Sequence, residues 1–419
     1  MPLALLALAI GAFGIGTTEF VVTGLLPEIS DEFGVSVPTA GFTASGYALG
    51  VMIGAPVLAI AGAKVSRKRM LMLMMVLFIA GNAVSAVAPA FGVLLTGRVI
   101  ASLAHGAFFG IGSVVAATLV APERRAGAIA LMFTGLTVAN VVGVPAGTLL
   151  GQQVSWRLTF AAITVVGVVA LIGVAALVPD GAGDPSPAER ASGGGLRGEL
   201  AAFRNAQVLL AMAMTVLGFG GVFAAITYIA PMMTDAAGYA ESSVTWLLVL
   251  FGVGLVAGNL VGGRYADRAL MPMLYASLGA LALALAAFTF TAHDKVAAAV
   301  TLPLIGAFGF AAVPPLQKRI LDNAAQAPTL ASAVNIGAFN LGNAIAAWFG
   351  GLVLAAGGGE TLPNLVGAAM AASALVLAVV AARMERRGAS RRSGAVVASG
   401  ARARAGVEPM AVTPSRERP

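Results

Sequence analysis

Residues 178–206 interrupt an otherwise apolar chain and read VPDGAGDPSPAERASGGGLRGELAAFRNA. Proline, glycine and charged residues crowd this stretch, and the run Gly193-Gly194-Gly195 disfavours a regular helix or strand. Such a composition is typical of a polar linker. Long runs of hydrophobic residues lie on both sides of it, so the sequence predicts two apolar halves joined by residues 179–206.

The composition of the whole chain indicates a membrane protein. Of its 419 residues, 59% are hydrophobic and only 10% are charged, and the mean hydropathy is +0.92. A soluble domain carries about 25% charged residues, so this chain has too few charges for a water-facing surface. We therefore expect the lipid bilayer to surround most of it.

The hydrophobic runs predict transmembrane helices, because about 20 apolar residues cross a hydrocarbon core about 30 Å thick. Polar interruptions divide the sequence into twelve such runs: 3–27, 39–62, 70–88, 91–120, 127–151, 158–178, 207–233, 243–263, 271–291, 295–317, 329–354 and 362–382. No Lys or Arg precedes the first run, which is too long for the core of a signal peptide and contains Glu19. We expect it to be a retained helix.

These runs predict an all-α integral membrane protein with twelve transmembrane helices. Residues 1–178 form a first six-helix bundle, 179–206 a cytoplasmic linker and 207–382 a second six-helix bundle. Residues 383–419 are rich in Arg, Ser and Gly, which predicts a disordered cytoplasmic tail.

The basic residues predict the orientation, because Lys and Arg concentrate in cytoplasmic loops. One set of alternate gaps, together with the tail, holds 22 of them, whereas the opposite set holds only Arg157 and Lys295. We therefore expect a multi-pass protein of the bacterial inner (cell) membrane with both termini in the cytoplasm. The net charge of +7 comes mostly from the tail, and we expect no nucleic-acid partner.

An internal duplication is indicated by the second run of each half. Gly46, Gly50 and Gly54 in one run match a ladder in the other formed by Gly254, Gly258 and Gly262. Similar loops follow them, GAKVSRKR at 62–69 and GRYADR at 263–268. Corresponding features in two halves of a membrane protein indicate structural repeats.

A third small-residue ladder lies in the run 127–151. It consists of Gly143, Gly147 and Gly151, with Pro145 inside it. Small residues at every fourth position let two helices approach closely. The ladder either packs statically or forms a sliding contact between the halves.

Once loop and tail charges are set aside, one acid and one Lys or Arg residue remain inside the predicted runs, Glu19 and Arg98. Charges inside a membrane are costly, about 2.5 to 3.5 kcal/mol on insertion scales, so an isolated acid and base indicate a functional site. Counting along the two antiparallel helices puts both at nearly the same depth. They can pair if their helices are neighbours, as a structural ion pair or as a coupling element.

Polar side chains on several runs are candidates for a cavity. Ser102, His105 and Phe109 follow Arg98 at helical spacing and so share one face. His105 is either a packed histidine or a proton carrier. Other candidates, each either interhelical glue or a substrate contact, are Thr23, Asn140, Thr227, Tyr228, Asn335 and Asn340.

Several chemistries are disfavoured by what the sequence lacks. There is no cysteine and no G-x-x-x-x-G-K-[ST] motif, which excludes disulfides and argues against ATP-driven transport. Two histidines without cysteines do not suggest a metal site. We expect no cofactor, no metal and no enzyme activity.

Several short motifs in this sequence are those of a known family. Gly16-Thr17-Thr18-Glu19-Phe20 in the first run is similar to the branch of bacterial chloramphenicol and sugar efflux proteins. This branch belongs to the twelve-helix drug:proton antiporters of the major facilitator superfamily, which the chain resembles. Further resemblances are Gly97-Arg98, His105-Gly106, Gly143-Val144-Pro145-Ala146-Gly147, Thr227-Tyr228-Ile229-Ala230-Pro231 and the stretch 335–351. The resemblance covers about residues 1–382.

This resemblance implies two pseudo-symmetric six-helix bundles around a central cavity, with alternating access. It implies that Arg98 is the arginine of the fourth helix, that Pro145 belongs to the antiporter motif and that the loop after the second helix is a gate. Ser66 replaces the usual aspartate of that loop, whereas Asp267, between Arg264 and Arg268, keeps it in the second half.

The sequence thus predicts a proton-coupled exporter of small amphipathic organic molecules, most consistent with a phenicol-type antibiotic. Glu19 is the expected proton carrier, with Arg98 and His105 beside it, and the protein is expected to be a monomer. Two alternatives stay open, a sugar or purine nucleoside exporter of the same superfamily and a non-transporting membrane sensor or scaffold.

Overall fold

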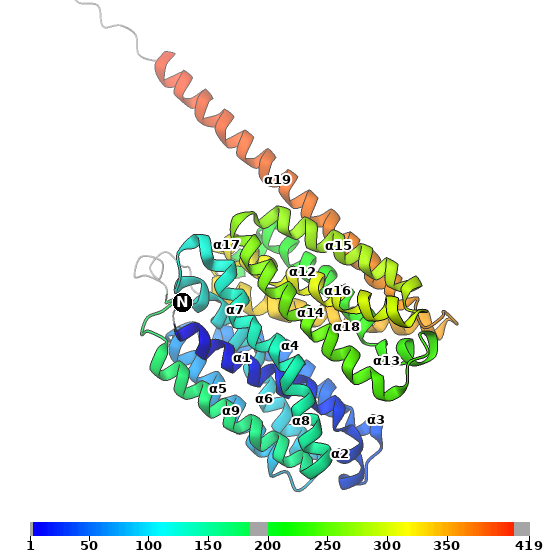
Figure 1. Ribbon diagram of the computed structural model, residues 1–419. Coiled ribbons are helices and arrows are strands. Elements are labelled where there is room, and N and C mark those ends of the chain that lie inside the picture. The colour runs from blue at the N-terminus through cyan, green and yellow to red at the C-terminus, as the bar shows by residue number, and fades with distance from the viewer. Residues whose placement is uncertain (1–2, 185–199, 406–419) are drawn as a thin grey trace, which may run out of the picture. The chain divides into compact units, whose positions relative to one another are not determined.

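The computed structural model describes residues 3–184 and 200–405, and these residues form helices and connecting turns without any strand. The predicted all-α fold is therefore confirmed. Met1–Ala378 form one compact unit and Val379–Pro419 a second. Figure 1 shows the helices of the first unit running alongside one another.

Helices of the first half match the six predicted runs to within a few residues. Two short helices, α2 and α3, follow the first of them and were not predicted. The elements are α1 (Leu3–Val21), η1 (Val22–Gly24), α2 (Leu26–Phe33), α3 (Val37–Ala40), α4 (Phe42–Ala61), α5 (Arg67–Ala86), α6 (Phe91–Thr118), η2 (Pro122–Arg124), α7 (Arg125–Val138), η3 (Ala139–Gly143), α8 (Val144–Leu150), η4 (Gly151–Ser155) and α9 (Trp156–Leu177).

Helices of the second half likewise match their runs, with breaks near prolines. The elements are η5 (Ala202–Arg204), α12 (Ala206–Ile226), α13 (Ile229–Pro231), η6 (Met232–Ala236), α14 (Glu241–Arg268), α15 (Leu270–Thr291), α16 (Lys295–Ala311), α17 (Val313–Asn323), α18 (Pro328–Ala355) and α19 (Pro363–Ala405).

Eleven stretches of the described residues are long and apolar enough to span a membrane. One of them, Pro122–Leu177, has 56 residues, far more than one crossing needs. The Thr159 hydroxyl donates to the Gly147 carbonyl oxygen at 2.7 Å, so the chain turns back at η4. This stretch therefore contains two predicted runs, and the protein has the expected twelve transmembrane helices.

The two corresponding glycine ladders pack in corresponding places. Gly50 and Gly54 of α4 face α6, where a Cβ would meet Ser102 and Leu103. Gly258 of α14 faces α16, where a Cβ would lie 1.9 Å from the Ala307 carbonyl oxygen. The second helix of each half thus packs against the fourth, which supports the pseudo-symmetry.

The two halves contact each other at the end that carries most of the basic loops. The Ser332 hydroxyl of α18 donates to the Gly110 carbonyl oxygen of α6 at 2.8 Å. Arg67, at the start of α5, donates through Nε to the Thr329 hydroxyl at 2.9 Å. Ala55 and Ala333 belong to one buried cluster across the same contact. Small side chains and hydrogen bonds therefore hold this end closed.

Three features differ from the prediction or lie outside the described residues. Arg319, expected in a loop, lies in α17, is 2% exposed and donates to the Gln207 side chain at 2.9 Å. Helix α19 continues to Ala405, through residues predicted to be disordered, because Ala and Arg are strong helix formers. The linker residues 185–199 and the tail residues 406–419 lie outside the described ranges. The boundaries between the two bundles stay a prediction.

Candidate functional site

Arg98 of α6 is completely buried, and its guanidinium is held mainly by backbone oxygen atoms. Nη1 donates to the Thr18 carbonyl oxygen at 2.6 Å and to the Thr18 hydroxyl at 3.1 Å, and Nε donates to the Thr43 carbonyl oxygen at 3.4 Å. The Cζ atom lies 4.4 Å from the centroid of the Tyr47 ring, a cation–π distance. These contacts tie α6 to α1 and α4.

The Thr18 hydroxyl has a second partner that fixes its direction. It donates to the Asn82 side chain of α5 at 2.6 Å while it accepts from Arg98. The Asn82 amide in turn donates to the Phe78 carbonyl oxygen at 2.8 Å. Four helices of the first half therefore converge on the guanidinium through a chain of satisfied hydrogen bonds.

His105 lies two turns along α6 from Arg98 and is 4% exposed. Its Nδ1 atom is 3.9 Å from the Glu19 Oε2 atom and 3.4 Å from the Tyr47 hydroxyl. The Glu19 side chain keeps 17% exposure, so the carboxyl is at the edge of the cluster. Three proton-bearing groups from three helices, a carboxyl, an imidazole and a phenol, thus meet around one nitrogen atom.

Glu19 and Arg98 lie together, as predicted, but do not pair directly. Among the described residues, the Glu19 carboxyl lies 3.9 Å from the His105 Nδ1 atom and has no contact within 4.0 Å with the Arg98 guanidinium. Arg98 instead binds the residue before it, Thr18. The reason is geometric, since the guanidinium reaches the α1 backbone first and the stacked Tyr47 ring holds it there.

One nitrogen atom of the guanidinium lacks a hydrogen-bond partner. Arg98 Nη2 is buried and donates to no atom of the described residues. A buried donor on a charged group without a partner is costly. The arrangement therefore offers a positively charged donor beside an acid, an imidazole and a phenol, which is suited to binding an oxygen atom and to exchanging a proton.

Of the other predicted cavity residues of the first half, only Phe109 contacts this cluster, with its ring centroid 5.1 Å from that of His105. Ser102 packs against Gly50 and donates to the Val99 carbonyl oxygen at 2.7 Å. Phe109 stacks on Phe133, with ring centroids 5.0 Å apart. Thr23 is exposed in η1, and the Asn140 amide bonds back to its own helix at 3.0 Å.

Predicted cavity residues of the second half also have local partners. The Tyr228 hydroxyl donates to the Ala347 carbonyl oxygen at 2.6 Å, which joins the end of α12 to α18. Thr227 and Asn340 bond to carbonyl oxygen atoms of their own helices. The Asn335 amide donates to Gln317 at 2.8 Å, and its oxygen atom is buried without a partner.

The third glycine ladder contacts its own half rather than the other. A Cβ on Gly143 would meet Thr17 and Phe13 of α1, and one on Gly147 would meet Val21 of α1. In the described conformation the ladder therefore packs within its own half, and a sliding contact between the halves stays a prediction. Pro145 follows the π-helical turn η3, which accommodates a residue without an N–H donor.

Helix α14 of the second half contacts the start of α7 in the first half. Asp267 accepts two backbone N–H bonds at the start of α7, from Ala126 at 2.7 Å and from Gly127 at 2.8 Å. A carboxylate is favourable at a helix N-terminus because it complements the unpaired N–H groups. Arg264 and Arg268 flank Asp267 in the sequence but are exposed.

Two residues of these contacts were not singled out in the sequence. Tyr47 is the single tyrosine before the linker, and a lone phenol inside an apolar run was the available signal. Asn259 is buried in α14 and donates to the Ala130 carbonyl oxygen of α7 at 2.6 Å. Its position inside a glycine-rich run gave no indication of the partner helix. The described residues contain no cluster of metal-ligating side chains.

Comparison with known proteins identifies the family. The family model described as "Major Facilitator Superfamily" matches residues 8–347. The chain belongs to this superfamily. It is therefore a membrane transporter and not an enzyme, with a small molecule as its substrate.

Relatives cover nearly the whole chain. The "Inner membrane transport protein YdhP" of Escherichia coli (strain K12) is 44% identical over 381 residues, which are 91% of this chain and 96% of the relative. The "Chloramphenicol resistance protein" of Streptomyces lividans is 38% identical over 379 residues, 90% and 94% of the two chains. The solved transporter FucP, in the outward conformation, has a TM-score of 0.74 at 16% identity and covers 90% and 98% of the two chains, which shows the shared fold.

Proposed function

We propose that this protein is a proton-coupled exporter of small amphipathic organic molecules, with a phenicol-type antibiotic as the substrate. The observation that carries the proposal is the buried cluster in which Glu19 meets His105 and Tyr47 beside the charge of Arg98. A structural core does not need an acid, an imidazole and a guanidinium at such cost in the membrane.

In this mechanism Glu19 carries the proton. Its carboxyl is the most exposed member of the cluster, so we propose that it exchanges protons with water in the conformation that opens to that side. Arg98 stays charged and fixed through Thr18, and its free Nη2 donor offers a place for a substrate oxygen atom or a water molecule. Proton and substrate then each favour the conformation that binds them better, which is the basis of exchange.

Asp267 and its arginine neighbours serve in gating. The carboxylate holds the start of α7 in the described conformation, in which the halves meet at the end with the basic loops. Opening to that side must break these two bonds together with those of Asn259. We propose that Pro145 and the ladder of Gly143 and Gly147 position α8 against α1, which carries Glu19, rather than form the moving contact.

The substrate class is supported by a relative and by the chemistry of the core. The Streptomyces lividans relative is named for chloramphenicol resistance. Phe219 of α12 contacts both Phe310 and Phe339, with ring centroids 5.3 and 4.9 Å away. These rings are buried in the described conformation, and we propose that they become accessible when the halves move, which would suit an amphipathic aromatic molecule better than a polyhydroxylated sugar. We further propose an inner-membrane monomer with both termini in the cytoplasm.

The proposal is tested in proteoliposomes with an imposed pH gradient. Radiolabelled chloramphenicol, L-fucose and guanosine are compared as substrates, with empty liposomes as the control. Uphill movement of chloramphenicol that a protonophore abolishes is the expected result. Uphill movement of fucose or guanosine alone establishes the alternative exporter, and no movement of any compound leaves a sensor or scaffold.

A further inference from the structure

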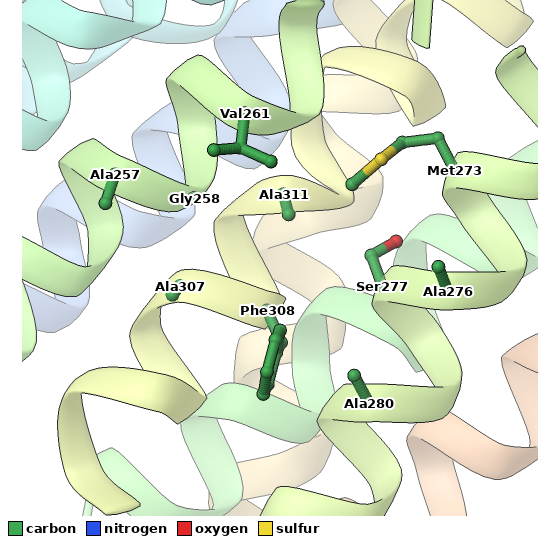
Figure 2. Close-up of a pocket in the computed structure, with 10 residues that line it drawn as sticks. All are labelled: Ala257, Gly258, Val261, Met273, Ala276, Ser277, Ala280, Ala307, Phe308 and Ala311. Atoms are coloured by element: carbon green, nitrogen blue, oxygen red, sulfur yellow. The ribbon is translucent and has the colours of Figure 1, made fainter. Parts of the chain in front are cut away.

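An apolar groove on the second half lies far along the chain from the proton-coupling cluster. It has a volume of about 310 Å³ and is formed by three helices, α14, α15 and α16. The residues that line it are Ala257, Gly258, Val261, Met273, Ala276, Ser277, Ala280, Ala307, Phe308 and Ala311. Figure 2 shows Val261 and Met273 facing the same space from two helices.

The lining accepts only an apolar occupant. Ser277 is its one polar side chain, and the hydroxyl already donates to the Leu274 carbonyl oxygen at 3.2 Å. Val261 is 46% exposed, and Ala257 and Ala276 are also exposed, so the groove opens sideways. The side of a membrane-spanning helix faces acyl chains, and an alkyl chain gains dispersion contacts with such a lining.

Two arginines continue the groove along α14. Ala257, Val261, Arg264 and Arg268 are spaced by four, three and four residues, which places all of them on one helix face. Arg264 therefore lies one turn beyond the groove, and Arg268 one turn further. Neither guanidinium forms an ion pair or hydrogen bond with the described residues, and Arg268 lies 5.7 Å from the centroid of the Tyr265 ring.

We propose that this groove binds one acyl chain of an anionic glycerophospholipid, whose phosphate lies between Arg264 and Arg268. The charge complementarity selects the head group, because paired guanidinium groups bind phosphate oxygen atoms well. It also selects the leaflet, because these arginines belong to the predicted cytoplasmic loops. The same end of α14 carries Asp267, so the bound lipid would lie beside the segment that joins the two halves.

Native mass spectrometry of the delipidated full chain tests the proposal. The protein is titrated with dioleoyl-phosphatidylglycerol and, separately, with dioleoyl-phosphatidylcholine. We expect a saturable first site for the anionic lipid and binding of the zwitterionic lipid about tenfold weaker or more. Removing either arginine alone should lower the affinity for the anionic lipid about fivefold. Equal binding of both lipids to the unchanged protein would overturn the proposal.

Variants separate the two parts of the site. Arg264→Gln with Arg268→Gln should reduce the affinity for phosphatidylglycerol to that for phosphatidylcholine. Its matched control, Arg69→Gln with Arg204→Gln, removes two exposed arginines of the same predicted side and should leave the preference unchanged. If both double variants lower the affinity for phosphatidylglycerol by the same factor, the attraction is a general surface effect and the site is refuted.

Filling the groove tests the acyl chain. Ala276→Trp should abolish the saturable site, whereas Ala287→Trp, at an exposed alanine three turns along the same helix, should not. Ala257→Trp fills the groove from α14 and keeps the test valid if Ala276→Trp destabilises the protein. Unchanged lipid binding by both groove variants would contradict the proposal. Displacement of the lipid by chloramphenicol would instead assign the groove to substrate, which also contradicts it.

Discussion

Tyr47 touches two members of the buried cluster through different atoms. Its ring lies 4.4 Å from the Arg98 Cζ atom, and its hydroxyl lies 3.4 Å from the His105 Nδ1 atom. The ring therefore supports the charge, whereas the hydroxyl contacts the proton-bearing groups. The two contributions can be separated by substitution.

Tyr47→Phe should reduce proton-driven export by less than about tenfold, because it removes one neutral hydrogen bond of about 0.5 to 1.5 kcal/mol and keeps the ring. Tyr47→Leu should reduce it much further, because Arg98 then loses its cation–π partner. The measurement is the initial rate of drug efflux at several external pH values. Tyr275→Phe is the control, and equal rates for Tyr47→Phe and Tyr47→Leu would refute the separate roles.

At the scale of single helices, Asp267 joins α14 to the start of α7. Its two hydrogen bonds cross between the halves at the closed end. Asp267→Asn keeps the shape of the side chain but replaces one acceptor oxygen by an NH₂ donor. That donor would face one of the two backbone N–H groups, of Ala126 or Gly127, and could not accept from it. The closed conformation should lose stability, since charge-assisted bonds at a helix N-terminus are the stronger kind.

Labelling of a cysteine at position 130 measures how often the two halves separate at this contact. Ala130 is 2% exposed, in contact with Gly263 and Asn259. A cysteine at this position should react with a maleimide several-fold faster in the Asp267→Asn background than in the unchanged background. Asp235→Asn, an exposed acid on η6, is the matched control. Equal labelling rates in all three proteins would show that Asp267 does not hold the halves together.

Helix α8 tests whether the glycine ladder positions α1. Gly147→Leu adds volume against Val21, two residues from Glu19, and against Thr159 of α9. Export should be lost while membrane insertion stays intact, because the added side chain is itself apolar. Val142→Leu, at a 54% exposed position nearby, should export normally. Normal export by Gly147→Leu would refute the need for close approach.

Sequence alone predicted the helices well and their neighbours poorly. The runs 91–120 and 271–291 match α6 and α15 to within two residues, because the thickness of the bilayer dictates the length of an apolar run. The faces were not predictable in the same way, since α8 is almost entirely apolar and its one glycine, Gly147, fits any close neighbour. Arg98 was found by its cost in a membrane, but its choice of Thr18 over Glu19 depends on side-chain geometry that periodicity does not contain.

At the scale of the whole molecule, the orientation is open to direct test because the chain has no native cysteine. Ala63, between α4 and α5, and His293, between α15 and α16, are both exposed. A cysteine at position 293 should react with a membrane-impermeant maleimide in intact cells, and one at position 63 only after permeabilisation. The reverse pattern would refute the predicted cytoplasmic termini.

The proton-coupling role of Glu19 is the central claim. Glu19→Gln mimics a permanently protonated carboxyl, so the variant should bind substrate and exchange it across the membrane but lose net transport driven by protons. Glu19→Asp should keep part of the coupling with a shorter reach. Glu360→Gln, at an exposed acid outside the cluster, should behave like the unchanged protein.

The most direct measurement compares two assays of Glu19→Gln in the same proteoliposomes, substrate counterflow without a gradient and uphill transport driven by a pH gradient. Retained counterflow with no uphill transport is the predicted result. Full uphill transport by this variant would contradict the account, because the coupling proton would then be carried by another group.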